Sequence, residues 1–385
     1  MISQARPLLL VTNDLGPHLG GIESFILGLL NELDGSKIVI YTSAQAGSEN
    51  FDHKLTADHG VVVIRDKSKI LLPTPRVFAQ VSEVMHQYGA TTVWYGATAP
   101  LAWMAPFLKQ AGAQRQIGMT HGHEVWWAKV PPFSWALRRM GNSLDVVTYL
   151  GNFTRDAIAP AFGSHPEYVR IAPGVAIDHF TPAANNEKSK DLLEKYGIGE
   201  RPVILSVGRL VHRKGQDRLI EAMPTVLKQI PNALLVLVGI GPYEKHLKKL
   251  VSKHGVEGSV LFLGRMKYEE LPNHFRLGDI FVMPSRSRFF GLEVEGLGIV
   301  YLEASASGLP VIAGASGGAP DAVIEGRTGY TVDGRDPVEI ATKIIYLLND
   351  VALAKNMGVA GRAWVEREWS WKIWGAKFSE LLGIE

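Results

Sequence analysis

The sequence predicts two doubly wound α/β domains, and three observations support that prediction. The chain is 385 residues long, short apolar runs recur along it, and amphipathic stretches separate these runs. Since an ordinary domain holds roughly 100 to 200 residues, the length suggests two domains. Continuous apolar runs that alternate with helices are typical of parallel sheets covered on both faces.

Apolar runs in both halves of the chain predict buried strands. In the first half they are PLLLVTND, KIVIYTS, TTVWYG, QIGMTH and DVVTYLG. In the second half they are PVILSVGRL, ALLVLVG, VLFLG, IFVMPS and PVIAG. Among the stretches between them, residues 216–229 and 243–253 have the amphipathic pattern of helices.

The boundary between the domains is expected near residues 171–191, where prolines, a glycine and a polar run interrupt the pattern. We predict one domain from residues 1–172 plus 370–385 and another from residues 173–369. The aromatic C-terminal helix would pack back onto the first domain, because its tryptophans need a surface to bury against. Open α/β sheets bind ligands beyond the carboxyl ends of their strands, so two such domains facing each other would form a cleft for two substrates.

The composition is that of a globular protein, with 46% hydrophobic residues, 20% charged residues and a formal net charge of +2. So small a net charge gives no general argument for nucleic-acid binding. The absence of cysteine excludes disulfides, thiolate metal sites and cysteine nucleophiles. The N-terminal apolar run is far too short for a signal peptide, so we predict a cytoplasmic protein.

Residues 87–108 carry no charge over about the length that spans a bilayer. Within them, TTVWYG has the pattern of a short strand closed by glycine, and Pro100 suits the first turn of a following helix. We therefore expect a strand followed by a helix here, with a transmembrane span as the less favoured alternative.

Two glycine pairs follow predicted strands. Gly20 and Gly21 open a helix after the first strand, where backbone amides can approach a phosphate or sugar that a Cβ would obstruct. An ordinary tight turn is the alternative. Gly239 and Gly241 resemble half of a dinucleotide fingerprint, but the third glycine is missing. We interpret that pair as a turn, with NAD binding as a weaker alternative.

Basic residues gather in the loop that precedes the predicted helix 216–229. Arg209 and Lys214 are five positions apart there, with His212 and Arg213 between them. Two cations in such a loop can reach one diphosphate. A solvated charge cluster is the alternative, but so many basic residues at the carboxyl end of one strand favour ligand binding.

His121 and His123 follow a predicted strand at positions i and i+2. They could ligate a metal, but only Glu124 stands near them in the sequence, so a hydrogen-bonding histidine fits better. The sequence also has no Asp-x-Asp, the usual arrangement that holds a divalent ion on a nucleotide diphosphate. We expect no metal site, and expect Arg209, Lys214 and helix dipoles to meet the charge of a diphosphate.

Glu295 and Glu303 are eight positions apart in EGLGIVYLEASASGLPV. On one continuous helix their side chains would be roughly 80° apart, so neither a shared face nor a salt-bridged face explains them. We predict that Glu295 precedes a helix on a glycine-rich turn and that Glu303 lies inside that helix.

Taken together, VGRLVHRKG and the segment that runs from FVMPSRSRFFGLEVEGLG to GYTVD resemble the GT-B glycosyltransferases, specifically the retaining group called family 4. In that family an Arg-x4-Lys pair binds the diphosphate, and a Glu-x7-Glu motif handles sugar and ribose. Both motifs occur here, in order and at the right spacing. The resemblance covers nearly the whole chain and implies the GT-B fold. One departure is EGLG where members often read EGFG, a mild apolar change.

The resemblance implies a role for each matching residue. Glu295 would contact the hydroxyls of the donor sugar, and Glu303 would hold the ribose hydroxyls of the nucleotide. Arg209 and Lys214 would neutralise the diphosphate leaving group. The other donor contacts that the resemblance implies are Gly20, Gly21, Arg265, Met266, Gly296, Leu297 and Gly298.

Sugar transfer from a nucleotide requires stabilisation of the departing diphosphate and of an oxocarbenium-like sugar. Nothing in the sequence marks the carboxylate pair of a retaining glycosidase, so the resemblance implies same-face attack in which the departing phosphate takes the acceptor's proton. His121, with His123 as its competitor, would orient the acceptor and the sugar. Residues 173–369 would then bind the nucleotide sugar, and residues 1–172 plus 370–385 the acceptor.

Aromatic and basic residues alternate in VWWAKVPPFSWALRRM, residues 125–140. Such a mixture suits the edge of an anionic bilayer, where rings lie at headgroup depth and cations meet lipid charge. Burial of the aromatic rings, with solvated arginines, is the alternative. The residues that we expect at the membrane are Trp126, Trp127, Trp135, Arg138 and Arg139.

The layout of the chain is similar to the phosphatidylinositol mannoside α-mannosyltransferases of actinobacteria. This similarity implies a retaining hexosyltransferase, without cofactor or metal, that moves α-mannose from GDP-mannose to a phosphatidylinositol mannoside lipid. It would act as a peripheral protein at the cytoplasmic face of the membrane. The alternatives are a UDP-sugar transferase with a soluble polysaccharide or polyol acceptor, a GT-B nucleotide-sugar epimerase, and a binding module without turnover.

Overall fold

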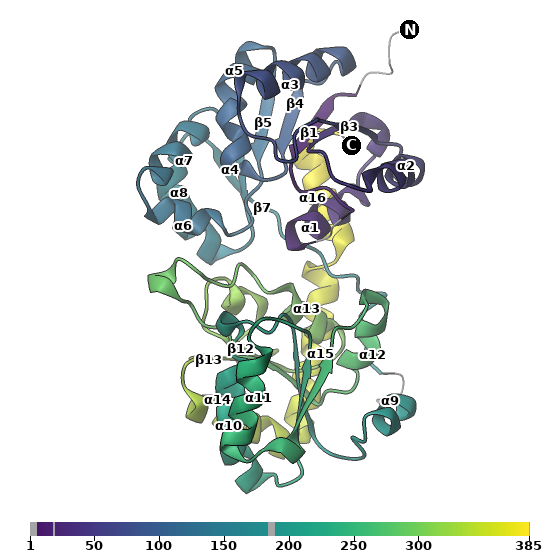
Figure 1. The fold of residues 1–385 in the computed structure, drawn as a ribbon, viewed down its shortest axis with the longest axis vertical. Coiled ribbons are helices and arrows are strands. Elements are labelled where there is room, and N and C mark those ends of the chain that lie inside the picture. Colours follow the sequence, from purple (N-terminus) through teal and green to yellow (C-terminus); the bar gives the residue numbers. More distant parts are fainter. Residues whose placement is uncertain (1–5, 18–19, 184–188, 385) are drawn as a thin grey trace. The chain divides into compact units, whose positions relative to one another are not determined.

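The chain folds into two parallel α/β units (Figure 1). One comprises Met1–Gly174 with Trp371–Glu385, and the other comprises Val175–Ser370. We call them the N-terminal and the C-terminal domain. Their boundaries follow Gly174 and Ser370, whereas the sequence placed them after residues 172 and 369. The computed structural model describes residues 6–17, 20–183 and 189–384.

The N-terminal domain is built on a sheet of parallel strands, in the order β3-β2-β1-β4-β5-β6-β7. The strands are β1 Leu8–Thr12, β2 Ile38–Thr42, β3 Val62–Arg65, β4 Thr92–Tyr95, β5 Arg115–Gly118, β6 Val146–Tyr149 and β7 Glu167–Arg170. The α-helices are α1 Gly21–Leu30, α2 Ser48–His59, α3 Pro75–Tyr88, α4 Thr98–Leu101, α5 Ala105–Gln110, α6 Glu124–Lys129, α7 Phe133–Gly141, α8 Asn152–Phe162 and α16 Trp371–Leu382.

The C-terminal domain has a second parallel sheet, in the order β10-β9-β8-β11-β12-β13. Its strands are β8 Val203–Val207, β9 Leu234–Val238, β10 Val260–Gly264, β11 Ile280–Met283, β12 Val311–Gly314 and β13 Gly329–Val332. Its α-helices are α9 Lys190–Lys195, α10 Gln216–Gln229, α11 Glu244–His254, α12 Leu271–Phe275, α13 Ile299–Ala306, α14 Pro337–Asn349 and α15 Val351–Glu368. The predicted pair of doubly wound domains is therefore confirmed.

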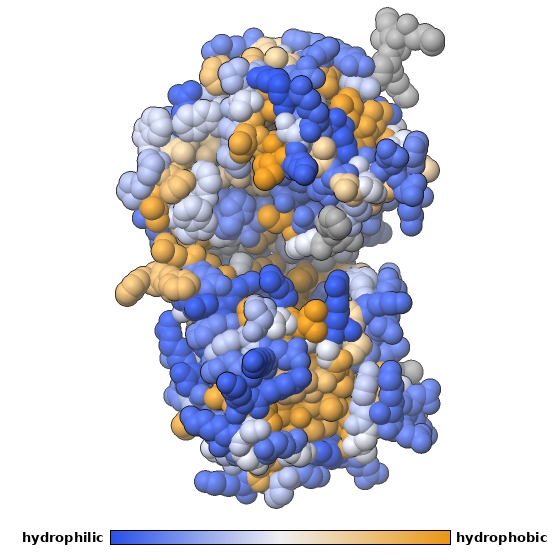
Figure 2. All heavy atoms as spheres, in the orientation of Figure 1, coloured by the Kyte–Doolittle hydropathy of each residue, from blue (hydrophilic) through white to orange (hydrophobic). Residues whose placement is uncertain are grey.

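The amphipathic segments lie where their periodicity predicts. In α10, the buried residues Leu219, Met223 and Val226 recur at helical spacing and enter the core of the C-terminal domain. Ile340 and Ile344 of α14 join the same core, while hydrophilic residues cover most of the visible face of both domains (Figure 2). Helices α10 and α11 begin within one residue of their expected starts, so hydrophobic periodicity was sufficient to predict them.

Residues 87–108 contain the end of α3, then β4, and then the short helices up to α5. Pro100 lies in α4, as its preference for a first turn predicts. Within the described residues, no helix is long and apolar enough to cross a membrane. The expected strand and helix are therefore present.

The C-terminal helix α16 packs against α1 of the N-terminal domain. The ring of Trp371 covers Gly28, where an added Cβ would lie 2.2 Å from the indole. Further along α16, the ring of Phe378 meets the edge of Trp94 from β4, with 4.9 Å between the ring centroids. The last described helix of the chain thus completes the core around the first strands.

Both sheets reverse their strand order beside the first strand of the domain. From β1 the chain builds β2 and β3 on one side and then places β4 on the other side. In the same way β8 has β9 on one side and β11 on the other. Loops diverge at such a reversal and leave a crevice at the carboxyl ends of the strands, which is where open α/β sheets bind ligands.

Candidate active site

In the C-terminal domain, the loop after β8 carries the predicted cations to the reversal between β8 and β11. Lys214 lies in a short 3-10 turn, His212–Lys214, directly before α10, and its side chain is buried. Arg209, at the start of this loop, is exposed. Gly215 follows with φ +78°, and an added Cβ would lie 1.9 Å from the carbonyl oxygen of Pro284. Close packing against the loop after β11 thus holds this turn in place.

The predicted division between Glu295 and Glu303 is confirmed. Glu295 lies on the turn before α13, and Glu303 lies inside the helix. Gly298, at the N-cap, has φ +79°, in the left-handed region that favours glycine. An added Cβ there would lie 2.4 Å from the ring of Tyr301. The glycine thus lets the chain turn sharply between the two acids.

Glu295 is the centre of an ion-pair cluster. Its Oε2 lies 2.9 Å from Nζ of Lys214 and accepts a 2.9 Å hydrogen bond from Nη1 of Arg213. Burial alone would raise the pKa of Glu295, but the charges of Lys214 and Arg213 outweigh burial and hold this pKa below its ordinary value. Glu295 is therefore an ionised hydrogen-bond acceptor in a buried setting.

Arg213 belongs to the predicted basic loop, but the sequence assigned it no role. Its Nε also lies 3.6 Å from Oε1 of Glu293, so it contacts two carboxylates of the loop that precedes α13. Arg209, five positions before Lys214, had been expected as the second cation at the site. In the structure, Arg213 is the residue that joins Lys214 in forming an ion pair with Glu295.

Glu303 differs from Glu295 in its charge state. Burial raises the pKa of Glu303 to about 7, and the charge of Lys214 only partly opposes this rise. Partial burial of the half-exposed Tyr268 raises the pKa of its hydroxyl to about 12, and the carboxylate of Glu303 adds to that rise. The predicted residues Arg265, which is exposed, and Met266, which is half-buried, follow β10 just before Tyr268.

The turn 295–298 rests on a second glycine turn that the sequence analysis did not single out. The amide of Gly318 donates a 2.8 Å hydrogen bond to the carbonyl oxygen of Glu295. An added Cβ on Gly317 would lie 2.1 Å from the same oxygen, and one on Gly318 would lie 2.1 Å from the carbonyl oxygen of Gly296. These contacts fix the backbone of Gly296, Leu297 and Gly298.

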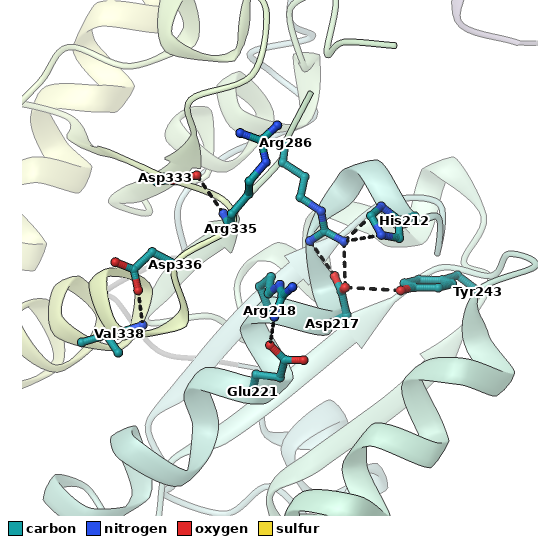
Figure 3. A network of polar contacts seen from close by, with 10 residues as sticks. All are labelled: His212, Asp217, Arg218, Glu221, Tyr243, Arg286, Asp333, Arg335, Asp336 and Val338. Atoms are coloured by element: carbon teal, nitrogen blue, oxygen red, sulfur yellow. Dashed lines mark hydrogen bonds and ion pairs between the residues drawn. The ribbon is translucent and has the colours of Figure 1, made fainter. Parts of the chain in front are cut away.

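A buried salt bridge ties α10 to the loop after β11 (Figure 3). Nη1 and Nη2 of Arg286 donate to the two carboxylate oxygens of Asp217 over 2.8 and 2.7 Å. The ring of His212 and the hydroxyl of Tyr243 complete the network around this pair. Burial would raise the pKa of Asp217, but Arg286 outweighs it and keeps this pKa below its ordinary value. The backbone amide of Arg286 also donates to the carbonyl oxygen of Arg213 over 2.8 Å, which joins the network to the ion-pair cluster.

The glycine pair after β9 is a tight turn, as interpreted from the sequence. An added Cβ on Gly239 would lie 2.0 Å from the carbonyl oxygen of Gly208. One on Gly241 would lie 2.2 Å from the carbonyl oxygen of Leu210. Since close contact with the loop after β8 already requires both glycines, they need no cofactor to explain them.

In the N-terminal domain, Gly20 and Gly21 stand at the N-terminus of α1, after β1. The amide of Gly20 donates to Oε2 of Glu23 over 3.0 Å, so the first turn of the helix caps itself with its own acid. Gly21 has open space where a Cβ would be. Both glycines are exposed.

His121 follows β5 and is held from two sides. Its Nε2 lies 2.6 Å from the carbonyl oxygen of Gly96, and its backbone amide donates to Glu124 over 3.0 Å. Burial lowers the pKa of His121. Because a carbonyl oxygen only accepts, this contact assigns the proton of the neutral ring to Nε2 and leaves Nδ1 as its acceptor.

His123 stacks on His121 with 6.4 Å between ring centroids, and its Nε2 lies 3.3 Å from Glu124. Asp14 belongs to the same charged neighbourhood, where burial and the charge of Glu23 raise its pKa to about 6. Within residues 6–17, 20–183 and 189–384, no group of three or more histidine, aspartate or glutamate side chains could hold a metal ion.

The aromatic segment after His123 is mostly packed on itself. Trp126 and Trp127 both contact the ring of Phe133, with centroid distances of 4.9 and 5.0 Å. Trp135 is 63% exposed, and its ring centroid lies 5.8 Å from that of Trp103. Of the two arginines, Arg138 donates to the carbonyl oxygen of Pro160, and Arg139 lies 4.8 Å from the ring centroid of Trp103.

Solved structures define the fold. The crystal structure of Anabaena HepE in complex with UDP has a TM-score of 0.81 at 19% identity and covers 98% of this chain and 99% of its own. Sucrose-phosphate synthase from Thermosynechococcus elongatus has a TM-score of 0.77 at 21% identity, with 98% of each chain covered. The two parallel α/β domains therefore form the GT-B fold of glycosyltransferases.

Sequence relatives then define the family. The family model described as "Glycosyl transferases group 1" matches residues 188–364, and the chain belongs to this family. The "GDP-mannose-dependent alpha-(1-6)-phosphatidylinositol monomannoside mannosyltransferase" of Mycolicibacterium smegmatis is 44% identical over 97% of this chain and 98% of its own length. A "GDP-mannose-dependent monoacylated alpha-(1-6)-phosphatidylinositol monomannoside mannosyltransferase" of Corynebacterium glutamicum is also 44% identical, over 100% of both chains.

Proposed function

We propose that the protein is a retaining α-mannosyltransferase that moves mannose from GDP-mannose to a phosphatidylinositol mannoside lipid. The names of its full-length relatives support both the donor and the class of acceptor. The observation that carries the chemistry is the ionised Glu295, which Lys214 and Arg213 position on the turn before α13.

Glu295 is proposed to accept hydrogen bonds from the hydroxyls of the donor sugar. Its ionised state supports this role, because a carboxylate only accepts hydrogen bonds and the hydroxyls of a sugar can donate them. The amides of Gly296, Leu297 and Gly298 precede α13, where the helix dipole favours negative charge. They are proposed to join Glu295 in binding the donor.

Lys214 and Arg209 are proposed to neutralise the diphosphate. Lys214 is held by Glu295 before any ligand binds, so its charge is in position when the leaving group departs. Arg209 is exposed at the carboxyl end of β8, which suits a side chain that waits for a ligand. With these cations at the phosphates, we expect transfer to proceed without a metal ion, and a chelator should leave the rate unchanged.

Glu303 is proposed to hold the ribose hydroxyls, with the backbone around Arg265 and Met266 beside the base. The pKa of Glu303, near 7, fits an acid that binds a neutral partner and does not anchor a phosphate. Glu303 interacts electrostatically with Tyr268, which follows β10 closely. This interaction supports a nucleoside site beside the residues that follow β10.

The N-terminal domain is proposed to bind the acceptor. Gly20 and Gly21, expected as donor contacts, are proposed to let a phosphate or sugar of the donor approach the N-terminus of α1, where Gly21 leaves open space and the amide of Gly20 is capped by Glu23. His121, neutral and fixed by Gly96, is proposed to orient hydroxyls through Nδ1. His123 stays the alternative for this role. Trp126, Trp127, Trp135, Arg138 and Arg139 are proposed to meet the surface of the membrane.

The proposed reaction breaks the bond between the anomeric carbon and the phosphate oxygen and forms a bond to the acceptor oxygen on the same face of the sugar. The departing phosphate oxygen receives the proton of the acceptor hydroxyl. Retention then follows without a carboxylate nucleophile. The protein supplies Lys214 and Arg209 to stabilise the charge of the departing diphosphate. The carboxylate of Glu295 accepts hydrogen bonds from the sugar hydroxyls, and the neutral His121 orients hydroxyls.

Product analysis tests this proposal. The purified protein is incubated with GDP-mannose or UDP-glucose and a membrane lipid extract, and the glycosylated lipid is identified by mass spectrometry. We expect a mannosylated phosphatidylinositol product from GDP-mannose alone. A clear preference for the UDP-sugar would contradict the donor, and turnover of a nucleotide sugar without any acceptor product would indicate an epimerase.

A pair of variants tests whether Glu295 binds the sugar and Glu303 binds the ribose. Glu295→Ala should damage sugar transfer more than nucleotide binding, since its proposed partner is the sugar. Glu303→Ala should weaken nucleotide affinity first. Calorimetric titration with GDP measures the affinity, and if both variants bind GDP as the unchanged protein does, the ribose role is wrong.

A further inference from the structure

A short segment of the C-terminal domain carries aromatic side chains into solvent. Phe289 is 61% exposed, Phe290 is fully exposed and Leu292 is 40% exposed. We call these three residues the aromatic tip. Apolar atoms project from one edge of this domain in Figure 2, where the loop before α13 projects in Figure 1.

The residues that flank the aromatic tip, Arg286 to Arg288 and Glu293, are held by hydrogen bonds and ion pairs; we call them the stem. Arg288 and Glu293 pair through backbone hydrogen bonds of 2.9 and 3.3 Å and through an ion pair of 3.2 Å. Below them, Arg335 donates to the carbonyl oxygen of Ser287 over 2.8 Å, and Arg286 is fixed by the buried Asp217 (Figure 3). The structure thus holds the tip outward on anchored residues.

The backbone of the tip is costly for these residues. Phe289 and Phe290 have φ values of +48° and +54°, in the left-handed region that non-glycine residues rarely adopt. The exposed Phe290 ring contributes nothing to the core of the domain. An apolar side chain held outward at such a cost points to a contact outside the domain.

The charges beside the tip are mostly paired. Arg288 pairs with Glu293, and Arg286 pairs with the buried Asp217. The guanidinium of Arg288 lies 4.6 Å from the ring centroid of Phe289, and Arg335 is exposed beside the stem. Exposed aromatic rings above paired charges match the headgroup layer of a bilayer, in which rings lie at headgroup depth and a cation such as Arg335 can meet phosphates.

A protein partner fits this surface less well. Two aromatic rings bury roughly 300 to 500 Å², whereas a stable protein interface needs roughly 1,200 Å² or more. A projecting tip can enter a fluid layer of headgroups without a complementary pocket. Size therefore favours a membrane.

We propose that the aromatic tip inserts into the headgroup region of an anionic membrane. The proposal rests on the proposed function, since a lipid acceptor requires the enzyme to work at a bilayer. Glu295 follows Leu292 by three positions. Insertion of the tip would therefore hold the donor site close to the lipid surface.

Vesicle binding tests the proposal with Phe289→Ser/Phe290→Ser. Vesicles of equimolar phosphatidylcholine and phosphatidylinositol are sedimented with the protein, and vesicles of phosphatidylcholine alone serve as the neutral reference. We expect the variant to bind the anionic vesicles about tenfold more weakly, since two apolar side chains lose their burial. Val351→Ser/Val359→Ser removes two exposed apolar side chains from α15 of the same domain and should bind as the unchanged protein does.

Activity separates the tip from the active site. Mannose transfer to acceptor lipid in vesicles should fall in the Phe289→Ser/Phe290→Ser variant. Transfer to a short-chain, dispersed acceptor should not change. If the unchanged protein transfers no mannose to either acceptor, the proposed function fails, and vesicle binding still tests the tip. Phe290→Ser alone, with an unchanged melting temperature, guards against misfolding.

Three results would overturn the proposal. Unchanged vesicle binding would mean that the tip is no membrane contact. Equal losses with vesicle and dispersed acceptors would place the tip in the acceptor site instead. A change of oligomeric state in sedimentation, from a larger species to a smaller one in the variant, would make the tip a contact between copies of the chain.

Discussion

Each domain places glycines before a helix at a reversal of its sheet, but the charges around the two turns differ. In the C-terminal domain Glu295 is ionised and bound by Lys214 and Arg213 from another loop. In the N-terminal domain the N-terminus of α1 is capped by its own Glu23, and burial raises the pKa of nearby Asp14 to about 6. One turn is built on ion pairs with another loop, and the other on a hydrogen bond from its own helix cap.

The difference teaches what each site is prepared to bind. A departing diphosphate needs cations that are fixed before the reaction, because reorganising charges during the reaction costs rate. An acceptor hydroxyl needs only neutral groups that fix its direction. The contrast between ion pairs in one domain and a neutral histidine in the other therefore matches a donor and an acceptor side. Each prediction below tests that contrast.

The largest effect is expected from Asp217→Ala. This change leaves Arg286 buried without its bidentate partner, and such a loss costs about 3–5 kcal/mol in the free energy of unfolding. Urea unfolding of the C-terminal domain measures it. As a control, Glu244→Ala removes the half-buried partner of the exposed Lys248 and should cost less than about 1 kcal/mol. Equal costs would mean that buried ion pairs do not support this site.

Lys214→Ala should lower kcat on the order of 10²-fold or more, because it removes a fixed cation from the leaving group. His121→Ala should lower kcat by about tenfold, the loss expected for one orienting hydrogen bond. Steady-state kinetics with GDP-mannose compares the two, and Lys253→Ala, an exposed lysine of the same domain, serves as the control. A larger loss in His121→Ala would reverse the contrast between the domains.

Glu303 should make donor affinity depend on pH. Its carboxyl, with a pKa of about 7, is protonated below that pH and ionised above it. The ionised carboxylate accepts hydrogen bonds from the ribose hydroxyls more strongly than the protonated acid does, so KM for GDP-mannose should fall, by up to about tenfold, between about pH 6 and about pH 8. Glu303→Gln should abolish this dependence. A wild-type KM that stays constant over this range would contradict the role.

The smallest effect is expected from Glu23→Ala in the N-terminal domain. The change releases the amide of Gly20 from its cap and should cost about 0.5–1 kcal/mol of stability. Transfer activity should stay within about threefold of the unchanged value, because a cap acts on the helix rather than on the reaction. Thermal unfolding and initial rates measure the two effects, and a large rate loss would place Glu23 in the chemistry.

The sequence predicted the inner strands of both sheets and missed edge strands. β3, β7 and β13 stand at sheet edges, and each contains half-buried positions. β7 (EYVR) and β13 (GYTV) carry a weak apolar signal, because an edge strand needs fewer apolar residues than a strand covered on both faces. β3 (VVIR) follows Val61 and has a clear apolar run, which was overlooked. β10 is also an edge strand, but its VLFLG run is apolar throughout and was found.

Spacing alone predicted the turn and the helix around Glu295, but not the partners of that acid. Arg213 and Glu295 are 82 positions apart, and Asp217 and Arg286 are 69 positions apart. Only the parallel order of β8 and β11 brings the two loops together. No local pattern announces such a pair, although an arginine in the otherwise uncharged PSRS after a buried strand was a signal of it.

The way in which α16 packs has a consequence for synthesis on the ribosome. Trp371 and Phe378 cover Gly28 and Trp94, which belong to the first elements that leave the ribosome. Domains fold as units during synthesis, beginning with the N-terminal one. Here the nascent N-terminal domain must wait, with this apolar surface uncovered, until the C-terminal domain has been translated. Chaperones would find their binding surface on the part of the chain that was made first.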